Sequence, residues 1–276
     1  MGKTDIRYIV VVSDLHCGST SGLCPPVVTL DDGGTYRQSK YQAWLWRLWL
    51  EFWTAWVPTV TRGEPYAVVV NDDAIEGNHH GITSVISANV STQSAIALEV
   101  LSGPRTRAAS FYITRGTEAH DGKACEAVEV LARMLDAKRC GTNASWWELD
   151  LLLGGRHVNL AHHIGTTSSA AYEASALNRE LVAALAEAAQ WCQSVPDVLV
   201  RSHRHRFAAV ELPSRSGSVQ CVVTPGWQLQ TPFARKIATM RVPQIGGLCL
   251  SAEDDGIRVR RRIWAPEKTK PHSPSA

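Results

Sequence analysis

The sequence predicts an α/β fold with a polar site at one edge of a parallel sheet. Short runs of β-branched residues, such as 68–70, alternate with longer segments of helical periodicity. Several of these runs end abruptly at acidic and histidine residues, most clearly the run that leads into residues 71–80. Ligands of open α/β proteins bind beyond the carboxyl ends of the parallel strands, so we expect these polar side chains to meet there.

Composition narrows the class of protein. A chain of 276 residues is long enough for a large core, and we expect one domain over 1–266 and a disordered tail over 267–276. The net charge of +2 identifies no partner, and seven cysteines without a C-x-x-C pair fit reduced thiols in a cytoplasmic protein. The apolar segment 44–60 contains Arg47 and Glu51, is short for a membrane span and ends at Pro58. It therefore predicts a buried helix and no membrane association.

The expected elements follow from periodicity and turn residues. Residues 17–40 form a long loop, and Leu45, Trp49 and Trp53 lie on one face of the first helix, where we expect them in the core. Helices are expected at 40–57, 84–102, 126–138 and 177–191. Strands are expected at 6–12, 68–70, 110–114, 146–153 (an edge strand), 157–161, 197–200 and 219–224, with a hairpin of 246–251 and 257–263.

Polar groups follow five of the expected strands in a fixed order. Eight of the ten histidines lie just beyond a strand, and the acids 14, 73 and 118 lie among them. Burying so many ionisable groups without partners would be unfavourable, and two divalent ions would offset that penalty. The groups are Asp14-Leu15-His16, Asp72-Asp73-Ala74-Ile75, Gly116-Thr117-Glu118-Ala119-His120, His162, and Ser202-His203-Arg204-His205.

This ordered pattern resembles the calcineurin-like metallophosphoesterases, in particular small phage and bacterial members, over residues 6–206. The resemblance implies a four-layer α/β/β/α sandwich of the metallophosphoesterase type, with two metal ions at the carboxyl ends of the strands. Manganese is the ion we expect, while iron, zinc and nickel fit the same ligands.

The resemblance also assigns roles to single residues. Asp73 would bridge the two ions and, with His120, form the catalytic pair. The first ion would be held by Asp14, His16 and His205, and the second by His162, His203 and a group from the 116–120 loop, for which Glu118 is the expected oxygen ligand.

The chain departs from the family pattern at three positions. Asp72 replaces the glycine before the bridging aspartate, and Ser202 replaces the glycine before His203. The third motif lacks Gly-Asn-His, so Glu118 would have to supply the missing oxygen. The extra carboxylate of Asp72 could distort the turn or attract a further cation, which leaves an impaired relative as an alternative.

Two assignments have competitors. Gly77-Asn78-His79-His80 looks like the missing Gly-Asn-His motif, but the order of strands favours the 116–120 loop, which leaves His79 and His80 as substrate-binding candidates. His162 directly follows its strand and is preferred to His163 as the ligand. His163, Arg115 and Arg204 then become further substrate-binding candidates.

The expected activity is hydrolysis of a phosphate ester by a hydroxide that bridges the two ions. The basic residues Arg258, Arg260, Arg261 and Arg262 favour a phosphodiester substrate, either a nucleotide or nucleic acid. The alternatives are a phosphomonoesterase acting on a protein or a small molecule, and a catalytically impaired module that binds metal and works through interactions.

Overall fold

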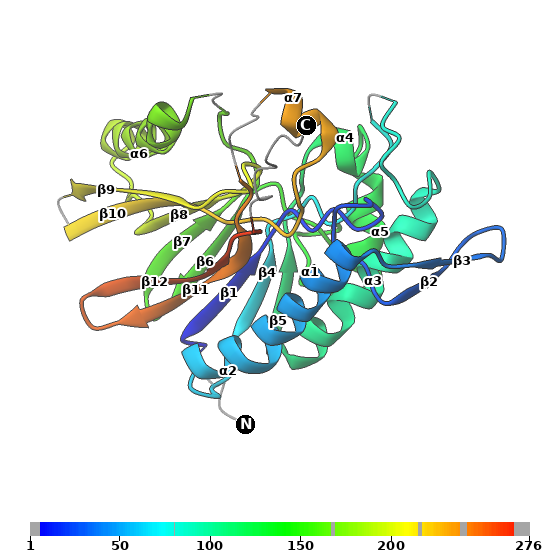
Figure 1. Cartoon of the computed structure of the whole chain (residues 1–276). Helices are drawn as coiled ribbons and strands as arrows, with labels where there is room; N and C mark the ends of the chain where they lie inside the picture. The colour runs from blue at the N-terminus through cyan, green and yellow to red at the C-terminus, as the bar shows by residue number, and fades with distance from the viewer. Residues whose placement is uncertain (1–5, 80, 167–168, 215–216, 238–241, 268–276) are drawn as a thin grey trace.

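Two five-stranded sheets face each other in the computed structural model, which describes residues 6–79, 81–166, 169–214, 217–237 and 242–267 (Figure 1). Helices cover the outer face of each sheet. The expected four-layer α/β/β/α sandwich is therefore confirmed. The predicted disordered tail, apart from Glu267, lies outside the described residues.

The first sheet has a parallel centre and an antiparallel edge. Strands β1, β4 and β5 run parallel, while β11 pairs with β1 and β12 with β11 in the antiparallel sense, as the predicted hairpin requires. The order across the sheet is β12 (Gly256–Trp264), β11 (Ile245–Glu253), β1 (Tyr8–Val12), β4 (Ala67–Val70) and β5 (Ser110–Ile113).

The second sheet is built in the same way. Its parallel centre is β7, β8 and β10, and the antiparallel strands β6 and β9 form its edges. The predicted edge strand is therefore confirmed as β6. The order is β6 (Leu149–Leu153), β7 (Arg156–Leu160), β8 (Val198–Arg201), β10 (Gly217–Val223) and β9 (Ala208–Ser214).

Strand β9 was not predicted, and neither was the hairpin of β2 (Val27–Thr29) and β3 (Thr35–Arg37) within the expected 17–40 loop. Strand β9 contains Pro213, which argues against a central strand but is tolerated at an edge. Both hairpin strands are only three residues long, too short to show alternation in the sequence.

Apolar packing separates the layers. Between the sheets, Ile9 and Val11 of β1 meet Val198 and Val200 of β8. Alternate residues of β1, such as Val10, point to the other face, where the helices α1 (Lys40–Glu51), α3 (Val90–Arg107) and α5 (Glu126–Met134) lie. Helix α6 (Glu173–Gln190) covers the second sheet (Figure 1). Leu45, Trp49 and Trp53 are buried, as predicted.

The predicted end of the first helix at Pro58 is wrong. A π-helical turn over Phe52–Trp56 follows α1, and the chain continues as α2 (Val57–Val60). Pro58 lies in the first turn of α2, where its missing N–H leaves no intrahelical bond unmade.

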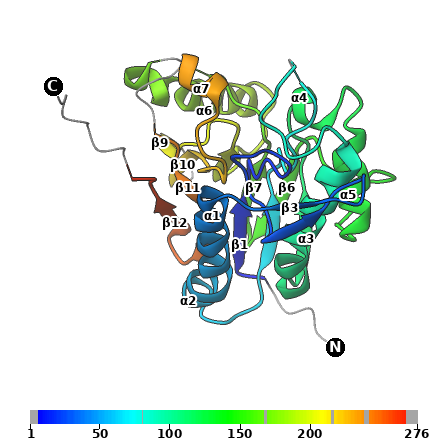
Figure 2. The same cartoon turned by 45° about the vertical axis from the view of Figure 1, so that its right-hand side comes forward.

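Other helix boundaries also differ from the predictions. Helix α3 begins at Val90, because the Asn89 side chain accepts a hydrogen bond from the Ser91 N–H and caps it; residues 84–89 are loop. Helix α5 ends at Met134 instead of 138, and α6 begins at Glu173 instead of 177. Two short helices, α4 (Glu118–Asp121) and α7 (Pro232–Ile237), lie toward one end of the molecule (Figure 2). No helix among the described residues is long and apolar enough to cross a membrane.

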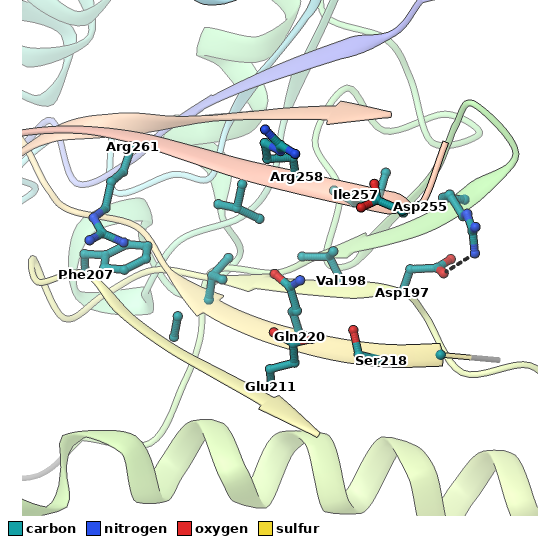
Figure 3. Close-up of a pocket in the computed structure, with 16 residues that line it drawn as sticks. Asp197, Val198, Phe207, Glu211, Ser218, Gln220, Asp255, Ile257, Arg258 and Arg261 are labelled. Carbon is teal, nitrogen blue, oxygen red and sulfur yellow. Dashed lines mark hydrogen bonds and ion pairs between the residues drawn. The ribbon is translucent and has the colours of Figure 1, made fainter. Parts of the chain in front are cut away.

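The sheets diverge on the side of β9 and β12, where a cavity of about 460 Å³ opens (Figure 3). Arg261 lies over the Phe207 ring there, 4.5 Å from its centre. Its basic neighbours are engaged elsewhere: Arg258 and Arg260 pair with Glu253, and Arg262 pairs with Glu51. The basic run therefore does not form a continuous cationic stripe, and it loses its value as evidence for nucleic-acid binding.

Glu129 of α5 anchors the segment that carries the chain into the second sheet. Its carboxylate accepts hydrogen bonds from the Ala144 N–H at 2.7 Å and the Ser145 hydroxyl at 2.7 Å, and it pairs with Arg133 at 2.8 Å. Burial opposes ionisation, but these bonds outweigh it and lower the pKa of Glu129 to about 2.

We expect Glu129→Gln to lower the urea midpoint of unfolding at pH 7. The native pKa of Glu129 lies below the ordinary value of 4.5, so the carboxylate stabilises the fold above pH 4.5 and loses this effect as the pH falls toward 2. The difference between variant and parent should shrink over that window, whereas the exposed Glu64→Gln should change little at either pH. A deficit that stays constant down to pH 2.5 would contradict this role.

Candidate metal centre

Polar residues from both sheets meet beyond the carboxyl ends of the parallel strands. Asp14 and His16 follow β1, Asp73 follows β4, His120 lies on α4 beyond β5, and the remaining histidines follow β7 and β8. Among the described residues, their ligand atoms form three groups whose members lie within 4.8 Å of one another: Asp14, His16 and His205; His16, Asp73 and His120; and Asp73, His162 and His203.

Asp73 lies at the centre of these groups. Its Oδ2 is 3.0 Å from His162 Nε2, 3.7 Å from His120 Nε2 and 3.9 Å from His203 Nδ1. Its Oδ1 accepts a hydrogen bond from the Thr117 N–H at 2.7 Å. One oxygen of Asp73 is thus held by the protein, and the other faces the histidines.

The donor atoms fit divalent cations. His16 Nε2 and His205 Nε2 face each other at 3.1 Å, so at least one of them presents a lone pair to the other. Asp14 Oδ1 and His162 Nε2 are buried close to groups of opposite charge without the geometry of a hydrogen bond. Buried oxygen and imidazole donors that converge in this way are typical ligands of manganese, iron or zinc.

The electrostatics also favour cations. Burial disfavours the Asp14 carboxylate, but His205 outweighs burial and lowers the Asp14 pKa to about 2. His162 and His120 likewise hold the pKa of Asp73 well below its usual value, against the effect of burial. Burial would lower the pKa of His162, yet Asp73 raises it to about 9. Both carboxylates are therefore ionised and require positive charge beside them.

The backbone at the site is strained. Nine described residues other than glycine have a positive φ, and five of them carry the site: Asp14, His16, Asp73, His203 and His205, with φ between 46° and 70°. This left-handed region is uncommon for residues with a Cβ, and it persists only where the surroundings enforce it. Such a concentration of strain at one place supports a functional site there.

Glu76 orients two of the histidines and was not singled out by the sequence. Its buried carboxylate lies 2.9 Å from His16 Nδ1 and accepts a hydrogen bond from Gln228 at 2.8 Å. Its backbone oxygen lies 2.5 Å from His120 Nδ1. Each ring therefore turns its Nε2 toward the site, as a carboxylate or carbonyl behind a metal-binding histidine does. A buried acid in the polar run after β4 was the only sequence signal.

Asn71 ties the strand ends together. Its side-chain amide donates to the Ser202 hydroxyl at 2.6 Å and to the Ala161 carbonyl at 3.0 Å, and it accepts from the Thr114 hydroxyl at 2.8 Å. Its backbone oxygen lies 2.8 Å from His162 Nδ1. The serine that replaces the family's glycine before His203 is thus part of this network.

Asp72 belongs to none of the three ligand groups and interacts with Asp121. Burial and the carboxylates of Asp121 and Asp73 raise the pKa of Asp72 well above its usual value, and burial and Asp73 raise that of Asp121 to about 7. Asp72 Oδ1 accepts a hydrogen bond from the Ala74 N–H at 2.8 Å, and Asp121 Oδ2 accepts one from the Gly116 N–H at 2.7 Å.

The third motif approaches Asp73 through its backbone. A Cβ on Gly116 would lie 2.2 Å from Asp73 Oδ1, so glycine is required there, and Thr117 takes the next place, with its hydroxyl 3.2 Å from the same oxygen. Glu118, expected as the oxygen ligand, is exposed and belongs to none of the groups that the described residues form. Thr117 replaces it as the residue of this loop that contacts Asp73, and no sequence signal pointed to Thr117.

The competing motif lies behind the centre. A Cβ on Gly77 would clash with the His120 carbonyl at 2.6 Å, and the His79 ring packs edge-on against that of His120 with centres 4.7 Å apart. His79 Nε2 is 3.6 Å from Glu76, and the residue joins none of the three ligand groups. His80 lies outside the described residues.

The remaining substrate-binding candidates lie around the ligand group of Asp73, His162 and His203. His163 is exposed, and its ring centre is 5.5 Å from that of His162. Arg204 donates to the Glu173 carbonyl at 2.7 Å, and Arg115 donates to the Ser145 hydroxyl at 3.0 Å. All three surround the site, and substrate binding by each stays a prediction.

No family model and no curated protein matches the sequence. Among solved structures, Vps29 of Chaetomium thermophilum matches with a TM-score of 0.41 and 11% identity over 95% of this chain and 98% of its own. A predicted phosphoesterase of Streptococcus pneumoniae matches with 0.38 and 10% over 94% and 98%. The sulfate thiohydrolase SoxB of Thermus thermophilus matches with 0.41 and 9% over 96% and 57%.

The group of Asp14, His16 and His205 and the group of Asp73, His162 and His203 each hold one carboxylate, but they differ in the charge behind their histidines. The Glu76 carboxylate lies 2.9 Å from His16 Nδ1, whereas the neutral Asn71 carbonyl lies 2.8 Å from His162 Nδ1, so we expect the two groups to bind metal unequally. Carboxylates provide most of the attraction for a hard divalent ion. Calorimetric titration with Mn²⁺ should therefore show two steps, the first at least about tenfold tighter, equivalent to about 1.4 kcal/mol.

Single substitutions assign the two steps. Asp14→Asn should weaken the tighter step, and His203→Ala should remove the weaker step and leave the tighter one. Two equal steps in the parent, or loss of the tighter step in His203→Ala, would contradict the assignment.

We expect Asp72→Asn to bind as much manganese as the parent, because Asp72 belongs to none of the three ligand groups and interacts with Asp121. The matched neighbour Asp73→Asn should lose at least one ion per chain. Elemental analysis after dialysis measures both. An ion lost from Asp72→Asn would show that Asp72 is a ligand after all.

Proposed function

We propose that this chain is a metal-dependent phosphoesterase of the calcineurin-like type and that its substrate is a phosphodiester, in the first place a nucleotide. The observation that carries the proposal is the position of Asp73, which belongs to two ligand groups. One holds His16 and His120 from the first sheet, and the other holds His162 and His203 from the second sheet. A pair of divalent ions bound there would lower the pKa of a water molecule and hold the phosphoryl oxygens during an in-line displacement.

His120 is the residue placed to handle the proton of the leaving group. The Glu76 carbonyl holds its Nδ1, and its Nε2 faces the site 3.7 Å from Asp73 Oδ2. With Nδ1 held by the carbonyl, Nε2 is the ring nitrogen that can donate a proton to the oxygen of the departing ester. The Glu76 carbonyl prevents the ring from turning away.

The arginines around the site favour a diester. Arg206 is paired with Glu173 at 3.1 Å, and Arg115 is engaged by Ser145 and by the Trp147 ring. A phosphomonoester brings two negative charges and a diester brings one, so a monoester needs more cationic groups. Of these two arginines, Arg206 is neutralised by its ion pair, whereas Arg115 contacts neutral groups and keeps its charge, which matches the single charge of a diester.

Two alternative functions use the same residues or are motivated by particular ones. A phosphomonoesterase would use the same ions and residues. A module that binds metal without turnover is motivated by Asp72 and by Thr117, whose hydroxyl is a weaker donor than the family's asparagine. The pairing of Asp72 with Asp121, outside the ligand groups, argues against the module.

The proposal is tested by hydrolysis of bis-p-nitrophenyl phosphate and p-nitrophenyl phosphate with Mn²⁺. We expect the parent to prefer the diester and Asp73→Asn to lose at least about 10²-fold in kcat, since the shared ligand is gone. Asp72→Asn is the matched control and should keep most of the activity.

Each of the other outcomes of this assay would support a different conclusion. Preference for the monoester would establish a phosphomonoesterase. Manganese bound by the parent without turnover of either ester would establish the binding module, and a parent that binds no manganese would remove the metal centre itself.

A further inference from the structure

Trp147 is an exposed tryptophan at the same edge as the metal centre. Its side chain is 59% exposed, which is unusual for so large an apolar ring. Strands β6 and β7 are antiparallel, and Leu149 pairs with Leu160. Trp147 lies two residues before this pair and His162 lies two residues after it, so both leave the ladder at the same end.

A second contact places Trp147 beside the third motif. Trp146 forms a parallel bridge with Thr114, and the Arg115 N–H donates to the Trp146 carbonyl at 2.8 Å. The Arg115 guanidinium then lies over the Trp147 ring, 4.9 Å from its centre. The next residue, Gly116, runs directly against Asp73 Oδ1. The Arg115–Trp147 pair is therefore directly adjacent in the chain to the backbone that holds the central carboxylate.

Hydrogen bonds hold Arg115 and the residues that precede Trp147. Arg115 Nε donates to the Ser145 hydroxyl at 3.0 Å, and Ser145 is in turn held by Glu129. The neighbouring Trp146 donates from its indole N–H to the Lys138 carbonyl at 2.7 Å. A fixed aromatic face with a cation beside it loses little entropy when a flat ring stacks on it.

We propose that Arg115 and Trp147 form a subsite for a nucleobase of the diester. The subsite lies on the side of the ligand group that holds His162 and His203. This inference rests on the proposed phosphodiesterase function and specifies its substrate. The indole stacks on the base, and the guanidinium contacts the negative charge of the same nucleotide. Every nucleobase has a π-face, so the subsite selects for nucleotides without selecting a sequence.

Two esters with the same leaving group test the subsite. Thymidine 5′-(p-nitrophenyl phosphate) carries a base, and methyl p-nitrophenyl phosphate does not. Trp147→Ala should raise KM for the thymidine ester about tenfold, the loss typical of one stacked base, and leave both constants for the methyl ester unchanged. Trp147→Phe should keep most of the preference for thymidine. Trp191→Ala removes another exposed tryptophan, at the end of α6, and should change neither ester.

Equal changes for both esters, or no change for either, would overturn the subsite. A parent that hydrolyses neither ester would instead contradict the proposed function. In that event the subsite is decided by calorimetric binding of thymidine 5′-monophosphate to the parent and to Trp147→Ala: binding at least fivefold weaker in the variant supports it, and equal binding overturns it.

Discussion

The hydrogen bonds of Asn71 are the constraint on which the site depends. This single amide sits at the end of β4 and joins Thr114 after β5, Ala161 after β7 and Ser202 after β8. Most of the contact between the two sheets is made by apolar side chains, which pack without fixing direction. A directional bond across the sandwich sets the strand ends in register, so that ligands from different sheets converge on Asp73.

Bringing the ligands together at Asp73 is unfavourable in free energy, and the rest of the fold offsets this penalty. Five residues of the centre adopt a left-handed backbone, and two ionised carboxylates are buried among histidines. The strain is held by bonds on all sides, including the chain of hydroxyls from Ser202 through Thr224 and Ser13 to Asp14. Because the penalty is concentrated where the ligands meet, bound cations would relieve much of the charge repulsion in the site.

Most strands along the chain, and the polar group at the end of each, could be predicted from the sequence. Both are local features, because a β-branched run followed by Asp or His is visible within ten residues. What the sequence could not show depends on long-range contacts. Glu76 reaches His16 and Gln228 across the fold, and Thr117 displaces Glu118 because Gly116 brings the backbone against Asp73. The edge strand β9 is likewise decided by tertiary context, which overrides weak local preference. The cap by Asn89 is different, because its bond to the Ser91 N–H is local and asparagine is a preferred residue before a helix.

The positions that depart from the expected pattern lie within the network around Asp73. Asp72 in the second motif interacts with Asp121, just beyond the third, and Asp121 in turn accepts from the Gly116 N–H that opens the third motif. Ser202 takes part in the Asn71 network. Asp72 Oδ1 accepts from the Ala74 N–H, but the buried Asp72 Oδ2 has no partner with hydrogen-bond geometry among the described residues, which disfavours the fold. The paired contacts hold the backbone around Asp73 and the histidines, on which any hydrolytic chemistry at this site depends.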